Sequence, residues 1–107
     1  MATVFDLLAA IRERPSMYVG EDDASRGNQL RNLELLLHGY ALAVRLHGLD
    51  EPVKNLPHEF AEYLRAKHDW SAAAGPVAAI REASGSDEEA WEVFWTLLDE
   101  YRGSLGH

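Results

Sequence analysis

The sequence predicts an all-α protein, a compact single-domain bundle of about five helices around one central helix. The chain has 107 residues, the size of one domain. Hydrophobic residues make up 47% of it and charged residues 26%, as in proteins that bury a core. Apolar residues recur at helical spacing, and no alternating run of β-branched or aromatic residues reaches the length of a strand. We therefore treat residues 1–107 as a single helical domain.

The first predicted helix covers residues 3–13. Its apolar positions follow helical spacing: Val4, Leu7, Leu8 and Ile11. Thr3 and Asp6 are spaced as a capping pair at its start. Pro15 ends it, because proline has no amide hydrogen and disfavours helical geometry in the residue before it.

Residues 14–20 (RPSMYVG) then form a compact structural turn. Gly20 is free to adopt a backbone conformation that other residues avoid. Met17 and Tyr18 are expected to cover the joint with apolar bulk. Arg14 is expected to bond the carbonyl groups exposed at the end of the preceding helix. The alternative for this turn is a contact with a partner.

The central helix is predicted over residues 29–47, after a polar loop or weak helix start at residues 21–28. Gly48 is its C-terminal cap. One apolar stripe consists of Leu30, Leu33, Leu37, Tyr40, Ala41 and Val44, and a second consists of Leu35, Leu42 and Leu46. Two stripes imply neighbours on more than one side. Gly39, inside the helix, suggests close approach of another helix.

Three further helices follow. Pro57 suits the first position of the next one, and Pro76 opens a short one that ends near Gly85. Ser86 and Glu89 form a capping box at the start of the last helix. The apolar stripe of that helix is Ala90, Phe94, Leu97, Leu98 and Tyr101.

The charge of the chain restricts its partners. Its 18 acidic and 10 basic residues give a net charge of −8, which argues against binding to nucleic acid or to an anionic membrane. A basic protein partner is compatible with this charge. Residues 1–49 carry a net charge of −1 and residues 50–107 carry −7. With no cysteine, signal peptide or membrane-spanning stretch in the sequence, we expect a cytoplasmic location.

We expect no metal and no cofactor. His38 and His47 are nine residues apart and so lie on opposite faces of one helix. The zinc pattern that begins at His58 has Glu62 where its second histidine belongs. No serine lies in a nucleophile elbow, and there is no cysteine nucleophile. We therefore predict no catalytic residue and no enzymatic activity.

A candidate partner-binding site lies on one side of the last predicted helix and comprises Glu88, Glu92, Trp95 and Asp99. Tryptophan is frequent among residues that dominate binding energy, and carboxylates around it would steer a basic partner. The alternative is that Trp91 and Trp95 lie at the margins of a wide buried face.

Residues 11–20 (IRERPSMYVG), followed by Leu30, Leu33, Leu37, Gly39, Tyr40 and Ala43, resemble a family of small bacterial helical proteins with an RPxMYxG turn. The closing segment is similar as well, at Gly75, Ile80, Ser84, Asp87, Glu88, Glu89, Phe94, Leu97, Leu98 and Tyr101. The resemblance covers most of the chain. Some of these proteins resemble immunity proteins encoded beside toxins, which implies a cognate toxin as the partner.

The same RPxMYxG string is similar to the N-terminal turn of type II topoisomerase ATPase subunits. That fold needs an Asp-Asn pair on the next helix and glycine-rich segments around the nucleotide. Here the helix offers Asn32 and Glu34, Gly85 stands alone, and the chain is too short to surround ATP. The match is local and misleading.

Together these features predict a non-catalytic protein-binding module, an immunity or inhibitor protein that occludes a basic surface of a bacterial toxin. We expect a monomer or a homodimer. One alternative is a small helical ligand-binding domain or enzyme that uses Glu34, His38 and Tyr40 in an interhelical cleft. The other is a self-associating structural subunit whose tryptophans are buried in a homodimer.

Overall fold

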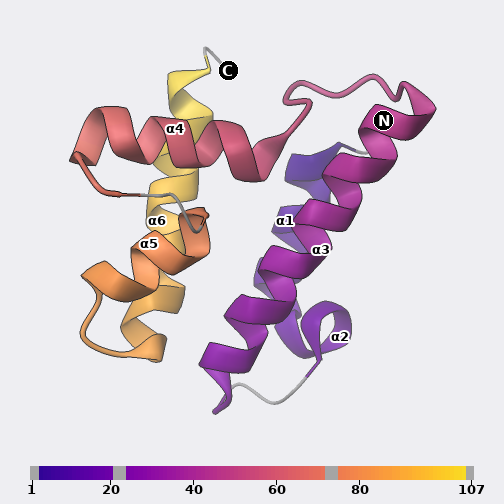
Figure 1. Cartoon of the computed structure of the whole chain (residues 1–107). Coiled ribbons are helices and arrows are strands. Elements are labelled where there is room, and N and C mark those ends of the chain that lie inside the picture. The colour runs from indigo at the N-terminus through magenta and orange to yellow at the C-terminus, as the bar shows by residue number, and fades with distance from the viewer. Residues whose placement is uncertain (1–2, 21–23, 72–74, 106–107) are drawn as a thin grey trace. The chain divides into compact units, whose positions relative to one another are not determined.

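Six α-helices account for most of the residues that the structure describes, and these residues contain no strand (Figure 1). The computed structural model describes residues 3–20, 24–71 and 75–105. The helices are α1 (Val4–Glu13), α2 (Pro15–Val19), α3 (Arg26–His47), α4 (Leu56–His68), α5 (Pro76–Ala83) and α6 (Asp87–Ser104). The all-α prediction is confirmed. The predicted number of about five helices is corrected to six, because the expected turn after Pro15 is itself a short helix.

The chain divides into two compact units, Met1–Pro57 and His58–His107. The first unit holds α1, α2 and α3, and the second holds α5, α6 and nearly all of α4. Each unit contains fully buried apolar side chains, such as Leu8 and Leu33 in the first and Phe94 in the second. The prediction of a single domain stays a prediction.

The start of α1 is bonded to a residue far along the chain. The Thr3 amide donates a hydrogen bond of 2.8 Å to Oδ2 of Asp6, which confirms the predicted capping pair. The Val4 amide, at the first helical position, donates a hydrogen bond of 2.8 Å to Oε1 of Glu51. Glu51 is buried, and its carboxylate lies where the helix dipole favours negative charge. This contact fixes the segment after α3 against the start of α1.

The residues expected to form a compact turn fold as α2 because proline suits the first turn of a helix. Gly20 ends α2 with a φ of +69°, a conformation that favours glycine. Met17 and Tyr18 are exposed, so the prediction that they cover the joint is wrong. Val19 is the buried residue of this helix and supplies the apolar contact instead.

Polar side chains of α3 bond the carbonyl groups at the end of α2. Nδ2 of Asn32 donates a hydrogen bond of 2.8 Å to the Val19 carbonyl, and Nε2 of Gln29 donates one of 3.4 Å to the Gly20 carbonyl. At the end of α1, the Arg14 backbone amide donates a hydrogen bond of 3.0 Å to the Ala10 carbonyl. The Arg14 guanidinium was expected to bond the carbonyl groups at this helix end, and among the described residues it does not. Asn32 and Gln29 thereby hold α2 against α3.

The long helix α3 begins at Arg26, three residues before the predicted start, and ends at His47. Gly48 follows with a φ of +60°, which confirms the predicted left-handed cap. The first predicted apolar stripe supplies its buried positions, with Leu30, Leu33, Leu37 and Val44 all buried.

Aromatic rings join α4 to α6 in the second unit. The ring of Phe60 lies 5.9 Å from that of Phe94 and 5.3 Å from that of Tyr101, measured between centroids. The Tyr63 hydroxyl donates a hydrogen bond of 2.6 Å to Oε1 of Glu100. This bond, with a smaller contribution from His68, holds the pKa of the Glu100 carboxyl below its usual value.

The start of α6 agrees in part with its sequence signature. The Glu89 amide donates a hydrogen bond of 3.1 Å to Oγ of Ser86, which confirms the predicted cap. The side chain of Glu89 accepts a hydrogen bond of 2.5 Å from the Gly85 amide, one residue before the N-cap, instead of from the Ser86 amide that the predicted capping box requires. α5 packs against α6, as Figure 1 shows.

Candidate functional site

A row of three exposed leucines runs along α3. Leu35, Leu42 and Leu46 are 64%, 47% and 68% exposed. At about 100° per residue, spacings of seven and eleven residues return a side chain to nearly the same side of a helix. We name these three side chains the leucine face. The buried positions of α3 lie on its other side.

The leucine face differs from what the sequence predicts. Its residues form the second apolar stripe, for which we expected a covering neighbour, and their exposure shows that no described element of the first unit covers them. Gly39 lies between Leu35 and Leu42 along the helix. A Cβ atom built at Gly39 meets no atom of the described residues within 4 Å, so no described helix of the first unit makes the close approach that we predicted there. The stripe is an open apolar surface with a gap at Gly39.

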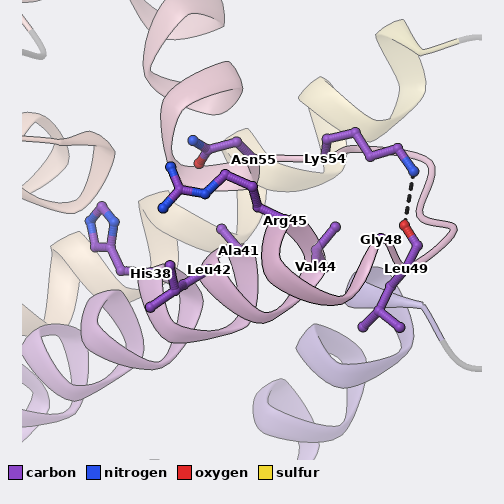
Figure 2. Close-up of a pocket in the computed structure, with 9 residues that line it drawn as sticks. All are labelled: His38, Ala41, Leu42, Val44, Arg45, Gly48, Leu49, Lys54 and Asn55. Carbon is purple, nitrogen blue, oxygen red and sulfur yellow. Dashed lines mark hydrogen bonds between the residues drawn. The ribbon is translucent and has the colours of Figure 1, made fainter.

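A pocket of about 510 Å³ adjoins the leucine face at the C-terminal half of α3 (Figure 2). It is bounded by α3 and by the connection that follows. The lining residues are His38, Ala41, Leu42, Val44, Arg45, Gly48, Leu49, Lys54 and Asn55. Sequence reasoning treated the connection as a simple link and missed its four lining residues, Gly48, Leu49, Lys54 and Asn55. The available signal was Leu49, which continues the seven-residue spacing from Leu42 beyond the end of the helix.

The charged groups of the pocket are basic. Arg45 and Lys54 are cationic, His38 joins them when protonated, and none of the lining residues is a carboxylate. Figure 2 shows His38 and Arg45 extending from the same side of α3. Nζ of Lys54 donates a hydrogen bond of 2.9 Å to the Leu49 carbonyl, which holds the connection at the helix end. An apolar wall beside cations suits an anionic group carried on an apolar body.

The predicted partner-binding residues on α6 do not form one exposed surface. Glu88, Glu92 and Asp99 are exposed. Trp95 is only 3% exposed, and its ring packs edge-on at 4.9 Å from Phe94 and 5.6 Å from Trp91. The burial of Trp91 and Trp95 agrees with the alternative given above, in which both tryptophans belong to a wide buried face of α6. The three carboxylates are what α6 offers to a partner.

The alternative cleft of Glu34, His38 and Tyr40 is not assembled. His38 lines the pocket described above, whereas the other two residues do not. The Tyr40 hydroxyl donates a hydrogen bond of 2.6 Å to Oε2 of Glu51, and burial together with this bond raises the pKa of Tyr40 to about 12. Oε2 of Glu34 is buried and accepts no hydrogen bond from the described residues. These three side chains therefore face different surroundings.

The described residues contain no group of three histidine, cysteine or acidic side chains that could hold a metal ion. Within the same part of the chain, no helix combines the length and the apolar character needed to cross a membrane. No protein-family model, curated protein or solved structure matches this chain. The resemblance to small bacterial helical proteins with an RPxMYxG turn, and to immunity proteins among them, therefore stays a prediction.

Proposed function

We propose that this chain is a non-catalytic protein-binding module that docks a partner on the leucine face of α3. The observation behind the proposal is the exposure of Leu35, Leu42 and Leu46, which is about half or more for each side chain. Burying the exposed part of one such leucine contributes roughly 1–2 kcal/mol, about half of the value for a fully exposed side chain. Contiguous exposed apolar surface on a helix is typical of an interaction site.

The position of the pocket supports the same proposal. Leu42 belongs both to the leucine face and to the pocket wall, so a segment laid along α3 can place a side chain in the pocket. Interfaces commonly combine a flat apolar strip with one pocket that receives an anchoring side chain. The pocket supplies an anchor point, and the leucines supply the area around it.

Site-directed photo-crosslinking in the native host tests this proposal. A photoreactive phenylalanine analogue is placed at Leu42, at Leu46 or, as the control, at Met17, which is 66% exposed but lies on α2. We expect one discrete covalent adduct from Leu42 and Leu46 and none from Met17. The adduct should disappear when Leu35→Asp is added. Adducts of the same pattern from all three positions, or from none, would show that the leucine face is not a docking surface.

A second candidate function is the immunity or inhibitor role, in which the chain uses carboxylates of α6 to occlude a basic surface of a toxin. The exposed carboxylates of Glu88, Glu92 and Asp99 favour it, because like charges on one helix attract a basic partner. The cytoplasm is the compartment that we propose for this role. The test is co-purification with the product of the adjacent gene in wild type and in Glu92→Lys. Loss of at least about tenfold in affinity supports the role, and unchanged affinity refutes it.

A further inference from the structure

We infer that the partner segment which docks on α3 is an acidic amphipathic helix, with apolar side chains on the leucine face and a carboxylate in the pocket. This inference rests on the proposed function and specifies the chemistry of its partner. It follows from three features of the first unit: the sign of the charges along the face, the composition of the pocket and the gap at Gly39.

The charges along the exposed side of α3 have one sign. Arg31, His38 and Arg45 recur at seven-residue spacing, which places them in a row beside the leucines. Glu34 is the single acidic residue of α3, and one of its carboxylate oxygens is buried. Arg45 forms no ion pair with any described residue. A chain of net charge −8 thus presents a basic row on this one helix.

The pocket fits a carboxylate better than a neutral group. Arg45 and Lys54 contribute cations, and the lining residues include no competing acid. A guanidinium binds a carboxylate through paired hydrogen bonds that are stronger than bonds between neutral groups. Leu42, which also lines the pocket, offers apolar surface that suits the methylene stem of a glutamate side chain. A glutamate of the partner would place its carboxylate at the Arg45 end of the pocket, since Nζ of Lys54 is bonded to the Leu49 carbonyl.

The gap at Gly39 favours a helix as the docking segment. Helices pack by seating the side chains of one in the grooves of the other, at axis separations of about 8–10 Å that depend on side-chain size. The open space above Gly39, with Leu35 before it and Leu42 after it, receives one apolar side chain of such a helix. The leucine face spans the twelve residues 35–46, so a partner helix of about three turns covers it.

A second copy paired with its own α3 against this α3 fits the surface less well. Such pairing would bring together two rows of Arg31, His38 and Arg45, with Glu34 as the single acidic residue of each helix. Like charges placed opposite each other across an interface are unfavourable. We therefore treat a second copy of the chain as the competing occupant of the leucine face, and the experiment below distinguishes it from an acidic helix.

Two designed peptides of about 20 residues test the inference. Both are amphipathic helices with the same leucine stripe, flanked by glutamates in one and by lysines in the other. Affinities for the full chain are measured by fluorescence anisotropy. The net charge of −8 favours the lysine peptide at long range, so a preference for the glutamate peptide requires a local basic site. We expect the glutamate peptide to bind at least about tenfold more tightly.

Matched variants locate the preference. Arg45→Glu should abolish it and Arg45→Lys should largely retain it. Arg65→Glu, which makes the same change in net charge at an exposed residue of α4, should leave it intact. Leu42→Asp should weaken both peptides. These results together support an acidic helix on α3.

Other results overturn the inference. Equal affinities, a preference for the lysine peptide or no binding of either peptide rules out an acidic helix as the partner segment. If Leu42→Asp converts a dimer of the chain to a monomer in sedimentation equilibrium, the occupant is a second copy. The proposed function fails separately, when crosslinking from Leu42 and Leu46 gives no specific adduct. If crosslinking gives a specific adduct but the two peptides bind with equal affinity, the leucine face is a docking surface and its partner segment is not an acidic helix.

Discussion

The Tyr40 hydroxyl donates a 2.6 Å hydrogen bond to Oε2 of Glu51, and this pair ties the middle of α3 to the segment that follows the helix. The other carboxylate oxygen accepts the 2.8 Å bond from the Val4 amide. One buried carboxylate therefore joins α1, α3 and the segment that follows α3 within the first unit. The leucine face and the pocket belong to α3 and to the segment after it, which this carboxylate holds in place.

Removing the carboxylate of Glu51 should destabilise the first unit strongly. Glu51→Ala leaves a buried amide and a half-buried hydroxyl without their acceptor, and we expect a loss of about 3 kcal/mol in the free energy of unfolding. Tyr40→Phe removes one of the two bonds and should cost about 1–2 kcal/mol. The control is Asp50→Ala, which deletes an exposed neighbouring charge and should change stability by less than about 0.5 kcal/mol.

Urea denaturation followed by circular dichroism measures these differences, and amide hydrogen exchange at Val4 reports the loss locally. The three tryptophans belong to the second unit, so their fluorescence should not follow the first. Equal stabilities of Glu51→Ala and Asp50→Ala would refute the role given to this carboxylate.

Stability should fall at alkaline pH because tyrosines stay protonated in the fold. The pKa values of Tyr40, Tyr63 and Tyr101 are each raised from 10.0 to about 12, with burial as the largest cause. Between pH 10 and pH 12 the folded chain therefore binds more protons than the unfolded chain. The stabilisation is complete below pH 10 and is lost as the pH rises through about 12. Urea midpoints measured across this range should fall less steeply in Tyr40→Phe than in wild type.

Replacing Trp95 should damage folding before it affects any partner. Its ring is buried between Phe94 and Trp91, so Trp95→Ala leaves a cavity and should cost about 3–5 kcal/mol. Trp95→Phe keeps most of the volume and should cost less. Thr96→Ala, at an exposed position of the same helix, is the control. A Trp95→Ala variant as stable as wild type in thermal denaturation would place the indole on the surface.

The amide of Asn32 should account for much of the stability of α2. Asn32→Ala deprives the Val19 carbonyl of its 2.8 Å hydrogen bond, and we expect a loss of about 1 kcal/mol. The control is Asn28→Ala, because Asn28 is an exposed residue of α3 whose side chain bonds Arg31 and not α2. Hydrogen exchange in α2 should accelerate in the first variant alone. Equal protection of α2 in both variants would mean that the amide does not hold it.

Local signals in the sequence predict much of this fold because they act within a few residues. The capping pair at Thr3 and the caps at Ser86 and Gly48 depend on backbone groups one helical turn away, and all three are confirmed. The extent of α2 was missed, since proline after a helix can end one helix and begin another.

The candidate site was harder to predict because exposure depends on what packs against a helix. The periodicity of α3 shows two apolar stripes but not which one is covered, and neighbours were expected on both, including the exposed stripe of Leu35, Leu42 and Leu46. For Trp95, helical angles alone placed the ring beside carboxylates, although a large side chain at the margin of a buried face can turn inward. The pocket depends on where the connection after α3 folds back, which no local pattern indicates.

The affinity of the crosslinked partner for Leu42→Asp tests the central claim most directly. Isothermal titration of that partner against wild type, Leu42→Asp and Met17→Asp compares two exposed apolar residues, one on the leucine face and one on α2. We predict that Leu42→Asp raises Kd by at least about 30-fold, as expected for a central interface residue, and that Met17→Asp leaves it unchanged. Dissociation constants within about twofold of wild type for both variants would contradict docking on α3.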